Sequence, residues 1–377
     1  MEYVLLLGVF EAGFLALLLY TKRNKVLPDK ILASLFLLYA LTILLSFVEV
    51  YNRKNAYPYP FLLNLAPCLI VLHGPAIWFY IRSQITATFK FKLIYLLHFL
   101  PFTVFLFDYF YRQLTFTSEE LVNIAINENF KHWLVYKVFV LVIALSSVLY
   151  QAWGLWLLNR YNHAMKSFFS SPKQFDMRWL RILLTSTLVT YLIINVFFVV
   201  DLFVHFLPFS SMQPISFVLA TVYILFLGYY GHRQTNVFAS NSLPLNVEAV
   251  PEPHLNPDPI DEKEERFVYA LMNYMSVEKP YTDSSLTLTK LADNMLVAPE
   301  FLSSILNGRL NRNFFDFVNH YRVEEFKKRC NDASNQNFTL LGIAYDCGFN
   351  SKATFNRVFK QYTGLTPSEY KSAYSVK

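Results

Sequence analysis

The sequence predicts an all-α protein in two parts: a seven-helix transmembrane bundle, and a cytoplasmic all-helical domain with two helix-turn-helix units joined by a spacer helix. The chain of 377 residues is 54% hydrophobic and 18% aromatic but only 16% charged, and its mean hydropathy is +0.31. Ordinary soluble domains are less apolar and more charged. The apolar excess lies before residue 231, most charges follow residue 260, and a helix-turn-helix pattern occurs twice in the polar part.

Seven apolar stretches are long enough to cross about 30 Å of hydrocarbon as helices. They lie near residues 3–20, 31–50, 61–81, 93–111, 133–158, 182–206 and 214–230. Loops rich in Lys and Arg resist translocation, so their distribution predicts orientation. The loops after spans one, three and five hold twelve of these residues, and the opposite loops hold four. We therefore expect the N-terminus outside and, after seven crossings, the C-terminus in the cytoplasm.

Five ionisable residues fall within the outer third of the predicted spans, where each is costly without a partner. They are Glu49, Asp108, Lys137, Asp201 and His205. One hypothesis is that they line a pocket for an external ligand, with Lys137 offsetting some of the acids. The alternative is that they reach the lipid headgroups or hold neighbouring helices together.

The sequence predicts neither an enzyme nor a metal or cofactor site. No HExxH motif, Asp pair or His with a nearby acid occurs at catalytic spacing in the spans, where His73 and His98 stand alone. The three cysteines, Cys68, Cys330 and Cys347, have no metal-ligand spacing and form no disulfide framework.

The segment 232–261 is rich in Asn and contains five prolines, so it is expected to be a flexible linker. It separates the predicted transmembrane sensor domain, residues 1–231, from the C-terminal domain, residues 262–377. A flexible chain of about 30 residues spans on the order of 30 Å. A signal would then act by bringing two C-terminal domains together, or by releasing one from the membrane surface, more than by rigid torque.

The first predicted helix-turn-helix unit covers about residues 286–308. Leu291 and Ala292 are expected to be the buried residues of the first helix, and Val297 follows the turn. In the second helix the inward positions are Leu302, Ile305 and Leu306, and the outward positions, at i, i+3, i+4 and i+7, are Glu300, Ser303, Ser304 and Asn307. A spacer helix over 314–330 follows, in which aromatic residues keep helical spacing.

The second unit covers about residues 339–362. Ile343 and Ala344 are expected to be the buried residues of the first helix and to let the second helix cross close to it. Gly348 supplies the turn, Ser351 is the expected N-cap, and Gly364 ends the second helix. Its outward stripe is Lys352, Ala353, Asn356, Arg357 and Lys360. These side chains suit a helix in the DNA major groove, because Arg pairs with guanine, Asn with adenine and Lys with phosphate. A last short helix is expected to open at Pro367.

Residues 267–373 resemble the DNA-binding domain of the AraC/XylS family of transcription regulators. The stretch IAYDCGFNSKATFNRVFKQYTGLTPSEY follows the family pattern of IA, GF, S, F, R, FK, G, TP and Y, and YRVEEFKK is similar to the family's spacer helix. The resemblance implies that both second helices enter successive major-groove segments of double-stranded promoter DNA, about 34 Å apart. The implied base-contact residues are Glu300, Ser303, Ser304, Asn307, Lys352, Ala353, Thr354, Asn356 and Arg357. RNA polymerase and a second copy of the chain are implied partners.

Two positions depart from the family pattern. Asn311 stands where the family usually has Gly, and Asn tolerates the left-handed conformation that a turn there needs. The first reading helix has no Arg or Lys before Arg309, so the second unit is expected to carry most of the affinity.

The pieces HGPAIWFYIRS, HFLPF and GYYGHRQTNVF look like the membrane portion that precedes this domain in some bacterial proteins, particularly of the Bacteroidetes type. The expected function is a one-component transcription regulator of the bacterial inner membrane, controlled by a signal at its transmembrane domain. One alternative is a membrane receptor or transporter whose helical tail binds protein. Another is a constitutive regulator that the spans only anchor in the lipid bilayer.

Overall fold

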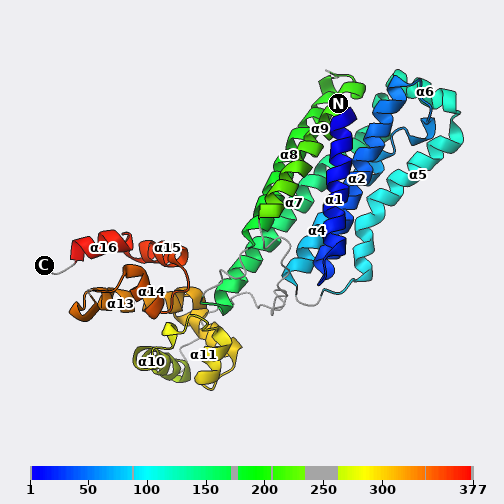
Figure 1. Cartoon of the computed structure of the whole chain (residues 1–377). Helices are drawn as coiled ribbons and strands as arrows, with labels where there is room; N and C mark the ends of the chain where they lie inside the picture. Colours follow the sequence, from blue (N-terminus) through cyan, green and yellow to red (C-terminus); the bar gives the residue numbers. More distant parts are fainter. Residues whose placement is uncertain are drawn as a thin grey trace. The chain divides into compact units, whose positions relative to one another are not determined.

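The computed structural model describes residues 2–86, 89–170, 177–204, 207–233, 262–335 and 337–374. These residues form helices and no strand, and an isolated bridge joins Phe169 to Thr287. The all-α class predicted from the sequence is therefore confirmed. The chain divides into two compact units (Figure 1), which are described separately below. Unit 1 comprises Met1–Asn159 and Met177–Asn246, and unit 2 comprises Arg160–Asp176 and Val247–Lys377.

Unit 1 is a bundle of long apolar helices. Its main helices are α1 (Glu2–Thr21), α2 (Leu27–Lys54), α3 (Ala66–Ile70), α4 (His73–Ile85), α5 (Leu100–Thr115), α6 (Ser118–Ile126), α7 (Leu134–Phe168), α8 (Arg178–Val204) and α9 (Phe209–Arg233). Seven helical segments in the described part of the chain are long and apolar enough to cross a membrane. They match the seven predicted stretches. The fifth differs most, because α7 continues to Phe168 where the sequence predicted an end near residue 158.

Prolines interrupt the third and fourth of these segments. The third consists of a 3-10 turn at Pro60–Leu62, then α3, then α4. The fourth begins as a 3-10 helix, Leu93–Phe99, and becomes α5 where Pro101 occupies the first turn. Pro lacks the amide hydrogen that a continuous helix needs, but the first turn of a helix leaves that hydrogen unpaired in any case.

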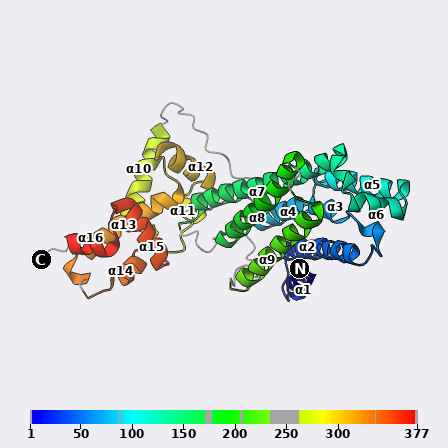
Figure 2. The ribbon, with the colours of Figure 1, turned by 90° about the horizontal axis from the view of Figure 1, so that it is seen from above.

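Small residues allow close helix contacts within unit 1. A Cβ atom on Gly8 of α1 would lie 2.5 Å from the Thr221 Oγ1 of α9, and one on Gly74 of α4 would lie 2.6 Å from a ring carbon of Tyr150 in α7. Both views show α1 beside α2 and α8 beside α9 (Figures 1 and 2). Small side chains at helix crossings are typical of helix packing in lipid.

Unit 2 contains two cores that share one helix. Its helices are α10 (Glu262–Val277), α11 (Leu288–Asn294), α12 (Pro299–Ser304), α13 (Phe314–Cys330), α14 (Leu340–Asp346), α15 (Lys352–Thr363) and α16 (Pro367–Tyr374). The first core contains Leu271, Leu291 and Leu302 from α10, α11 and α12, and the second contains Ile343 and Phe355 from α14 and α15. The predicted linker, residues 232–261, lies outside the described residues except for the end of α9.

The spacer helix α13 divides its apolar side chains between these two cores. Phe314, Phe317 and Val318 pack in the first core, and Phe315, Val323 and Phe326 pack in the second. A helix that is apolar on both sides is a buried helix. The spacer predicted from the sequence over 314–330 has the bounds of α13. Asn311, in the turn before it, has a φ of 47°, the left-handed conformation expected at this position.

Candidate nucleic-acid interface

The second helix pair consists of α14 and α15, and side-chain caps fix where both helices begin. The Thr339 hydroxyl accepts the Gly342 N–H at 3.0 Å, and the Ser351 hydroxyl accepts the Thr354 N–H at 3.2 Å. Each cap satisfies one of the amide groups that a helix start leaves without a partner. Ser351 is therefore the N-cap that the sequence predicted, and Gly364, with a φ of 77°, ends α15 as expected.

The turn between α14 and α15 requires glycine at position 348. Gly348 has a φ of 94°, and a Cβ atom there would lie 2.2 Å from the Tyr281 carbonyl oxygen. The next residue, Phe349, donates its N–H to the Ala344 carbonyl at 3.1 Å and buries its ring in the second core. The turn therefore sets the angle at which α15 crosses α14.

The outward face of α15 carries the predicted polar stripe. Phe355, Val358 and Phe359 are buried. The exposed residues of the stripe are Lys352, Ala353, Asn356, Arg357 and Lys360. The Arg357 guanidinium lies 5.7 Å from the centre of the Phe315 ring, a cation–π contact between the end of this side chain and α13.

Thr354 differs from the other implied base contacts. Its side chain is only 8% exposed, and its hydroxyl is 3.0 Å from the Ser351 hydroxyl that caps the helix. The structure therefore places Thr354 in the cap, on the buried side of α15, and not in the outward stripe.

The first helix pair has the same turn geometry as the second. It consists of α11 and α12, and a π-helical turn, Ile305–Arg309, extends α12. Val297 donates its N–H to the Ala292 carbonyl at 3.0 Å, as Phe349 does to Ala344 in the second pair. Leu296 stands where the second pair has Gly348, with a φ of 57°. This backbone is sterically costly for leucine, whose side chain is 93% exposed.

In the first pair, α12 and the π-helical turn after it carry no Lys or Arg before Arg309. Glu300 and Ser304 are exposed, whereas Ser303 and Asn307 are half-buried. The Asn307 amide donates to the Ser303 carbonyl at 2.9 Å, and the Ser304 hydroxyl donates to the Phe301 carbonyl at 2.8 Å. Arg309 pairs with Glu264 of α10 at 2.5 Å. This face therefore offers less positive charge than α15.

A buried arginine that sequence reasoning missed holds unit 2 together. Arg322 of α13 is 0% exposed, and it donates to the carbonyls of Tyr281 and Asp283 at 2.8 and 2.9 Å and to the Ser170 hydroxyl at 3.1 Å. Burial lowers the pKa of Arg322 to about 10, so it stays charged at neutral pH. A signal was present in the sequence, because Arg322 falls on the same helix face as Phe315 and Phe326, where a core residue is expected.

Ser170 lies in the segment between α7 and α8 that the sequence assigned to a membrane-domain loop. It belongs to unit 2. Its hydroxyl donates to the Leu286 carbonyl at 2.7 Å, and its carbonyl accepts from the Asn319 amide at 3.3 Å. Phe168 packs against the first core. Nothing in the local sequence pattern predicted this contact, because its partners lie more than a hundred residues further along the chain.

A second charged cluster lies at the C-terminal end of α13. Glu325 accepts hydrogen bonds from Lys279 at 3.1 Å and from Arg329 at 2.7 Å. Burial alone would raise the pKa of Glu325, but the bonds from Arg329 and Lys279 hold it below its ordinary value. The described residues of the chain contain no cluster of His, Cys, Asp and Glu that could hold a metal ion. Burial raises the pKa of the Cys347 thiol to about 12, so this thiol is unreactive.

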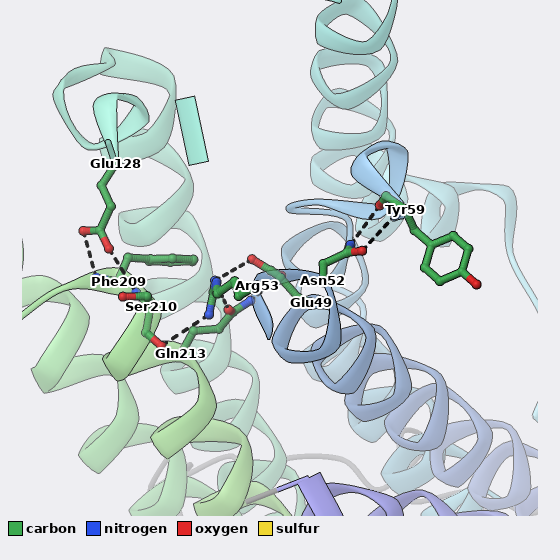
Figure 3. A network of polar contacts seen from close by, with 8 residues as sticks. All are labelled: Glu49, Asn52, Arg53, Tyr59, Glu128, Phe209, Ser210 and Gln213. Atoms are coloured by element: carbon green, nitrogen blue, oxygen red, sulfur yellow. Dashed lines mark hydrogen bonds and ion pairs between the residues drawn. The ribbon is translucent and has the colours of Figure 1, made fainter. Parts of the chain in front are cut away.

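The structure describes four of the five candidate sensing residues of unit 1, and their surroundings differ. Glu49 joins α2 to α9, because its carboxylate lies 2.8 Å from the Arg53 guanidinium and accepts a hydrogen bond from the Gln213 amide nitrogen at 2.6 Å (Figure 3). Arg53 in turn donates to the side-chain oxygen of Gln213 at 2.7 Å. These three residues satisfy one another. Glu49 is therefore a helix-joining residue in this structure.

Asp201 and Asp108 also have cationic partners. Asp201 pairs with Lys131 at 2.9 Å, so Lys131 and not Lys137 offsets this acid. Asp108 pairs with Arg112 at 2.8 Å and lines a cavity. Lys137 is half-buried on α7, and His205 lies outside the described residues. Of the four candidate residues that the structure describes, Asp108 lines the cavity and Glu49, Lys137 and Asp201 do not.

Glu128 lies near the Lys131 and Asp201 pair and caps α9. Its carboxylate accepts the N–H groups of Phe209 and Ser210 at 2.9 and 3.1 Å (Figure 3). A carboxylate at a helix start pairs amides that would otherwise be free and offsets the helix dipole.

Comparison with known proteins identifies the C-terminal region. Residues 291–373 match a family model described as a helix-turn-helix domain. An uncharacterized HTH-type transcriptional regulator, YijO of Escherichia coli K12, is 29% identical over 91 residues, which cover 24% of this chain and 31% of that protein. The uncharacterized HTH-type transcriptional regulator SACOL0084 of Staphylococcus aureus COL is 33% identical over 86 residues, 23% of this chain and 11% of that protein.

The chain thus spans less than a third of the length of these curated relatives. A solved structure of a protein of unknown function from Listeria innocua is 23% identical and covers 29% of this chain and 97% of its own, with a TM-score of 0.26. The residues matched by the family model begin within α11 and run through the spacer helix α13 into α16. The C-terminal part of this protein is therefore a helix-turn-helix domain of the kind found in HTH-type transcriptional regulators.

Proposed function

We propose that the protein is a membrane-integrated, one-component transcription regulator of AraC type that binds promoter DNA through both helix pairs under control of a signal received by unit 1. The observation that carries this proposal is the exposed polar stripe of α15, whose opposite face buries Phe355, Val358 and Phe359. The helix-turn-helix family match supports DNA as its partner. The seven apolar segments of unit 1 support the lipid bilayer as its environment.

The proposal assigns unequal roles to the two helix pairs. In α15 the stripe offers Arg357 and Asn356 to base edges, and Lys352 and Lys360 to phosphates. In α12 and the following π-helical turn, Glu300 and Ser304 are exposed, and the one Lys or Arg of this stretch, Arg309, pairs with Glu264. The second pair therefore supplies most of the affinity, and the first pair adds selectivity. Contacts with RNA polymerase and a homodimer stay predictions from the resemblance.

The test uses the full chain in lipid nanodiscs, because unit 2 includes residues before α8. Preferred duplexes are selected from random DNA, and affinity is then measured by gel shift at several salt concentrations. Arg357→Ala is expected to lose about 1–3 kcal/mol at the selected site and to relax base preference at one position. Lys328→Ala removes the same charge from the exposed surface of α13, which the proposal places in no groove, and is expected to keep the base preference.

Failure to select any sequence with folded protein would contradict DNA reading. That result would favour the alternative in which unit 2 binds another protein. An Arg357→Ala variant with the footprint and base preference of the unmodified protein would contradict the role given to α15.

A further inference from the structure

Part of unit 2 comes from the chain between α7 and α8. Phe168 is the last residue of α7 and packs against the first core of unit 2. Phe169 forms an antiparallel bridge with Thr287, the N-cap of α11. Ser170 follows and is 0% exposed. These three residues, 168–170, are named the docked segment, and apolar packing, a backbone bridge and side-chain hydrogen bonds hold them in unit 2.

The docked segment is bound to the buried guanidinium of Arg322. The Ser170 hydroxyl accepts a hydrogen bond from Arg322 Nη2 at 3.1 Å, and the Ser170 carbonyl accepts one from Arg322 Nη1 at 3.4 Å. The same carbonyl accepts from the Asn319 amide at 3.3 Å. A buried donor that loses its partner stays unpaired at a cost in free energy. Ser170 therefore helps to fix the position of the guanidinium.

Arg322 also lies against the turn between α14 and α15. Its Nε donates to the Tyr281 carbonyl at 2.8 Å. A Cβ atom on Gly348 would lie 2.2 Å from that carbonyl oxygen and 2.9 Å from Arg322 Nε. The guanidinium lies 5.9 Å from the centre of the Phe349 ring. The position of this turn therefore depends on the position of the guanidinium.

Phe349 connects the turn to α15. Its N–H donates to the Ala344 carbonyl of α14 at 3.1 Å, and its ring centre lies 5.1 Å from that of Phe355 in α15. Phe355 is buried on the face of α15 opposite the polar stripe. Closely packed cores transmit displacements, because they contain few voids that could absorb them. A continuous series of contacts thus runs from Ser170 through Arg322 and Phe349 to α15.

The docked segment is also close along the chain to a candidate membrane span. It begins at the last residue of α7, one of the seven segments that are long and apolar enough to cross a membrane. The predicted linker, by contrast, separates the end of α9 from the start of α10. A flexible linker transmits no defined displacement. The docked segment therefore offers the more direct covalent route from a span to α15.

We propose that the docked segment is a positioning element for α15, and that the chain between α7 and α8 controls base reading through the hydrogen bonds of Ser170 to Arg322. This proposal rests on the proposed function, because it concerns base reading by α15. Ser170 itself touches no DNA. It holds Arg322, Arg322 supports the turn at Gly348, and the turn sets the angle at which Arg357 meets the base edges.

A first experiment tests the docking without DNA. The full chain, with its three cysteines replaced by alanine and a protease site inserted after Asn246, is placed in lipid nanodiscs. Phe169→Cys with Thr287→Cys is expected to form a disulfide on mild oxidation, because opposite residues of an antiparallel pair lie close enough. The two pieces then stay joined after cleavage until a reductant is added. Phe169→Cys with Ser372→Cys, at an exposed position of α16, is expected to give separate pieces. Separation of the pieces in both variants overturns the docking.

A second experiment measures base preference at the position of the selected duplex that Arg357→Ala relaxes. Preference is the ratio of the affinity for the selected base to that for the other bases. Ser170→Ala is expected to lower this ratio by roughly 2- to 30-fold. Ser167→Ala, whose hydroxyl makes a 3.5 Å contact within α7, is expected to keep it. A smaller folded fraction lowers all affinities equally, so a merely structural role of Ser170 leaves the ratio unchanged.

A combined variant tests whether Ser170 acts through α15. In Arg357→Ala the preference at this position is already relaxed, so adding Ser170→Ala is expected to lower the ratio no further. A further loss equal to that of Ser170→Ala alone overturns the positioning role, and so does an unchanged ratio in folded Ser170→Ala. If Ser170→Ala does not fold, Ser170→Cys, which keeps a side chain of similar size and weakens the hydrogen bonds, replaces it.

The outcomes separate this proposal from the proposed function. If the unmodified protein selects no DNA sequence, the proposed function is rejected, and the role of the docked segment in base reading is rejected with it. If selection is intact but Ser170→Ala keeps the base preference of the unmodified protein, only the positioning role is rejected. The disulfide result depends on neither, because it is obtained without DNA.

Discussion

At the scale of single residues, backbone geometry at the turns decides which side chains are tolerated. Position 348 holds glycine with a φ of 94°, and the equivalent position 296 holds leucine with a φ of 57°. The two positions differ in the room around their side chains as well as in φ. Leu296 projects into solvent, being 93% exposed, whereas a side chain on Gly348 would meet the Tyr281 carbonyl. The first turn therefore tolerates a strained residue that the second turn has no room for.

Gly348→Ala is expected to destabilise unit 2 by about 3 kcal/mol or more, because the added methyl group requires a shift of the Tyr281 and Arg322 region. Hydrogen exchange of the α14 and α15 amides in the full chain measures the effect. The control is Gly308→Ala, where a Cβ atom would meet nothing within 4 Å. Equal protection of those amides in the two variants would contradict this explanation.

At the scale of elements, α13 organises unit 2 because it contributes to both cores and carries Arg322 between them. Arg322 donates hydrogen bonds to the Tyr281 and Asp283 carbonyls and so ties the segment before α11 to α13. The segment that contains Ser170 completes the same arrangement, since its hydroxyl both donates to Leu286 and accepts from Arg322. A buried cation of this kind depends on every one of its partners.

Ser170→Ala is expected to lower the stability of unit 2 by about 1–3 kcal/mol, because it removes the hydroxyl and leaves the Leu286 carbonyl and one Arg322 donor short of a partner. Ser167→Ala is the matched control, since that hydroxyl makes only a 3.5 Å contact within α7. Denaturant unfolding, followed by hydrogen exchange of the backbone amides of α11 and α13, compares the two variants. An unchanged Ser170→Ala variant would show that this segment is dispensable for the folding of unit 2.

At the scale of the whole molecule, function depends on the side of the membrane that unit 2 faces. The loop charges predict an N-terminus outside and a C-terminus inside, and the seven apolar segments permit that odd number of crossings. DNA binding requires the same orientation. The two requirements are independent, because one comes from loop composition and the other from the helix-turn-helix domain.

Single cysteines test this orientation after Cys68, Cys330 and Cys347 are replaced. Asn123→Cys in α6 is expected to react with a membrane-impermeant maleimide in intact spheroplasts, and Asn24→Cys, in the loop between α1 and α2, is expected to react only after lysis. Both positions are exposed. The reverse labelling pattern would place unit 2 away from the chromosome and reject the proposed function.

The sequence by itself determined the helical segments, the turns and the outward stripe of α15. Those features depend on the spacing of apolar residues and on local backbone preferences, both of which can be read within about ten residues. Ser351 as a cap, Gly364 as an end and the left-handed Asn311 belong to this group. The position of Thr354 inside the cap is also local, but a motif alignment assigns it by position and overlooks its hydrogen bond.

The tertiary structure alone decided which distant groups meet. Lys131 and not Lys137 pairs with Asp201, Gln213 completes the bonding of Glu49, and Ser170 joins the core of unit 2. The cavity between the helices of unit 1 is likewise a property of packing, because its lining residues come from helices far apart in the sequence. Such contacts join residues far apart in the chain, so no local pattern of charge or periodicity encodes them.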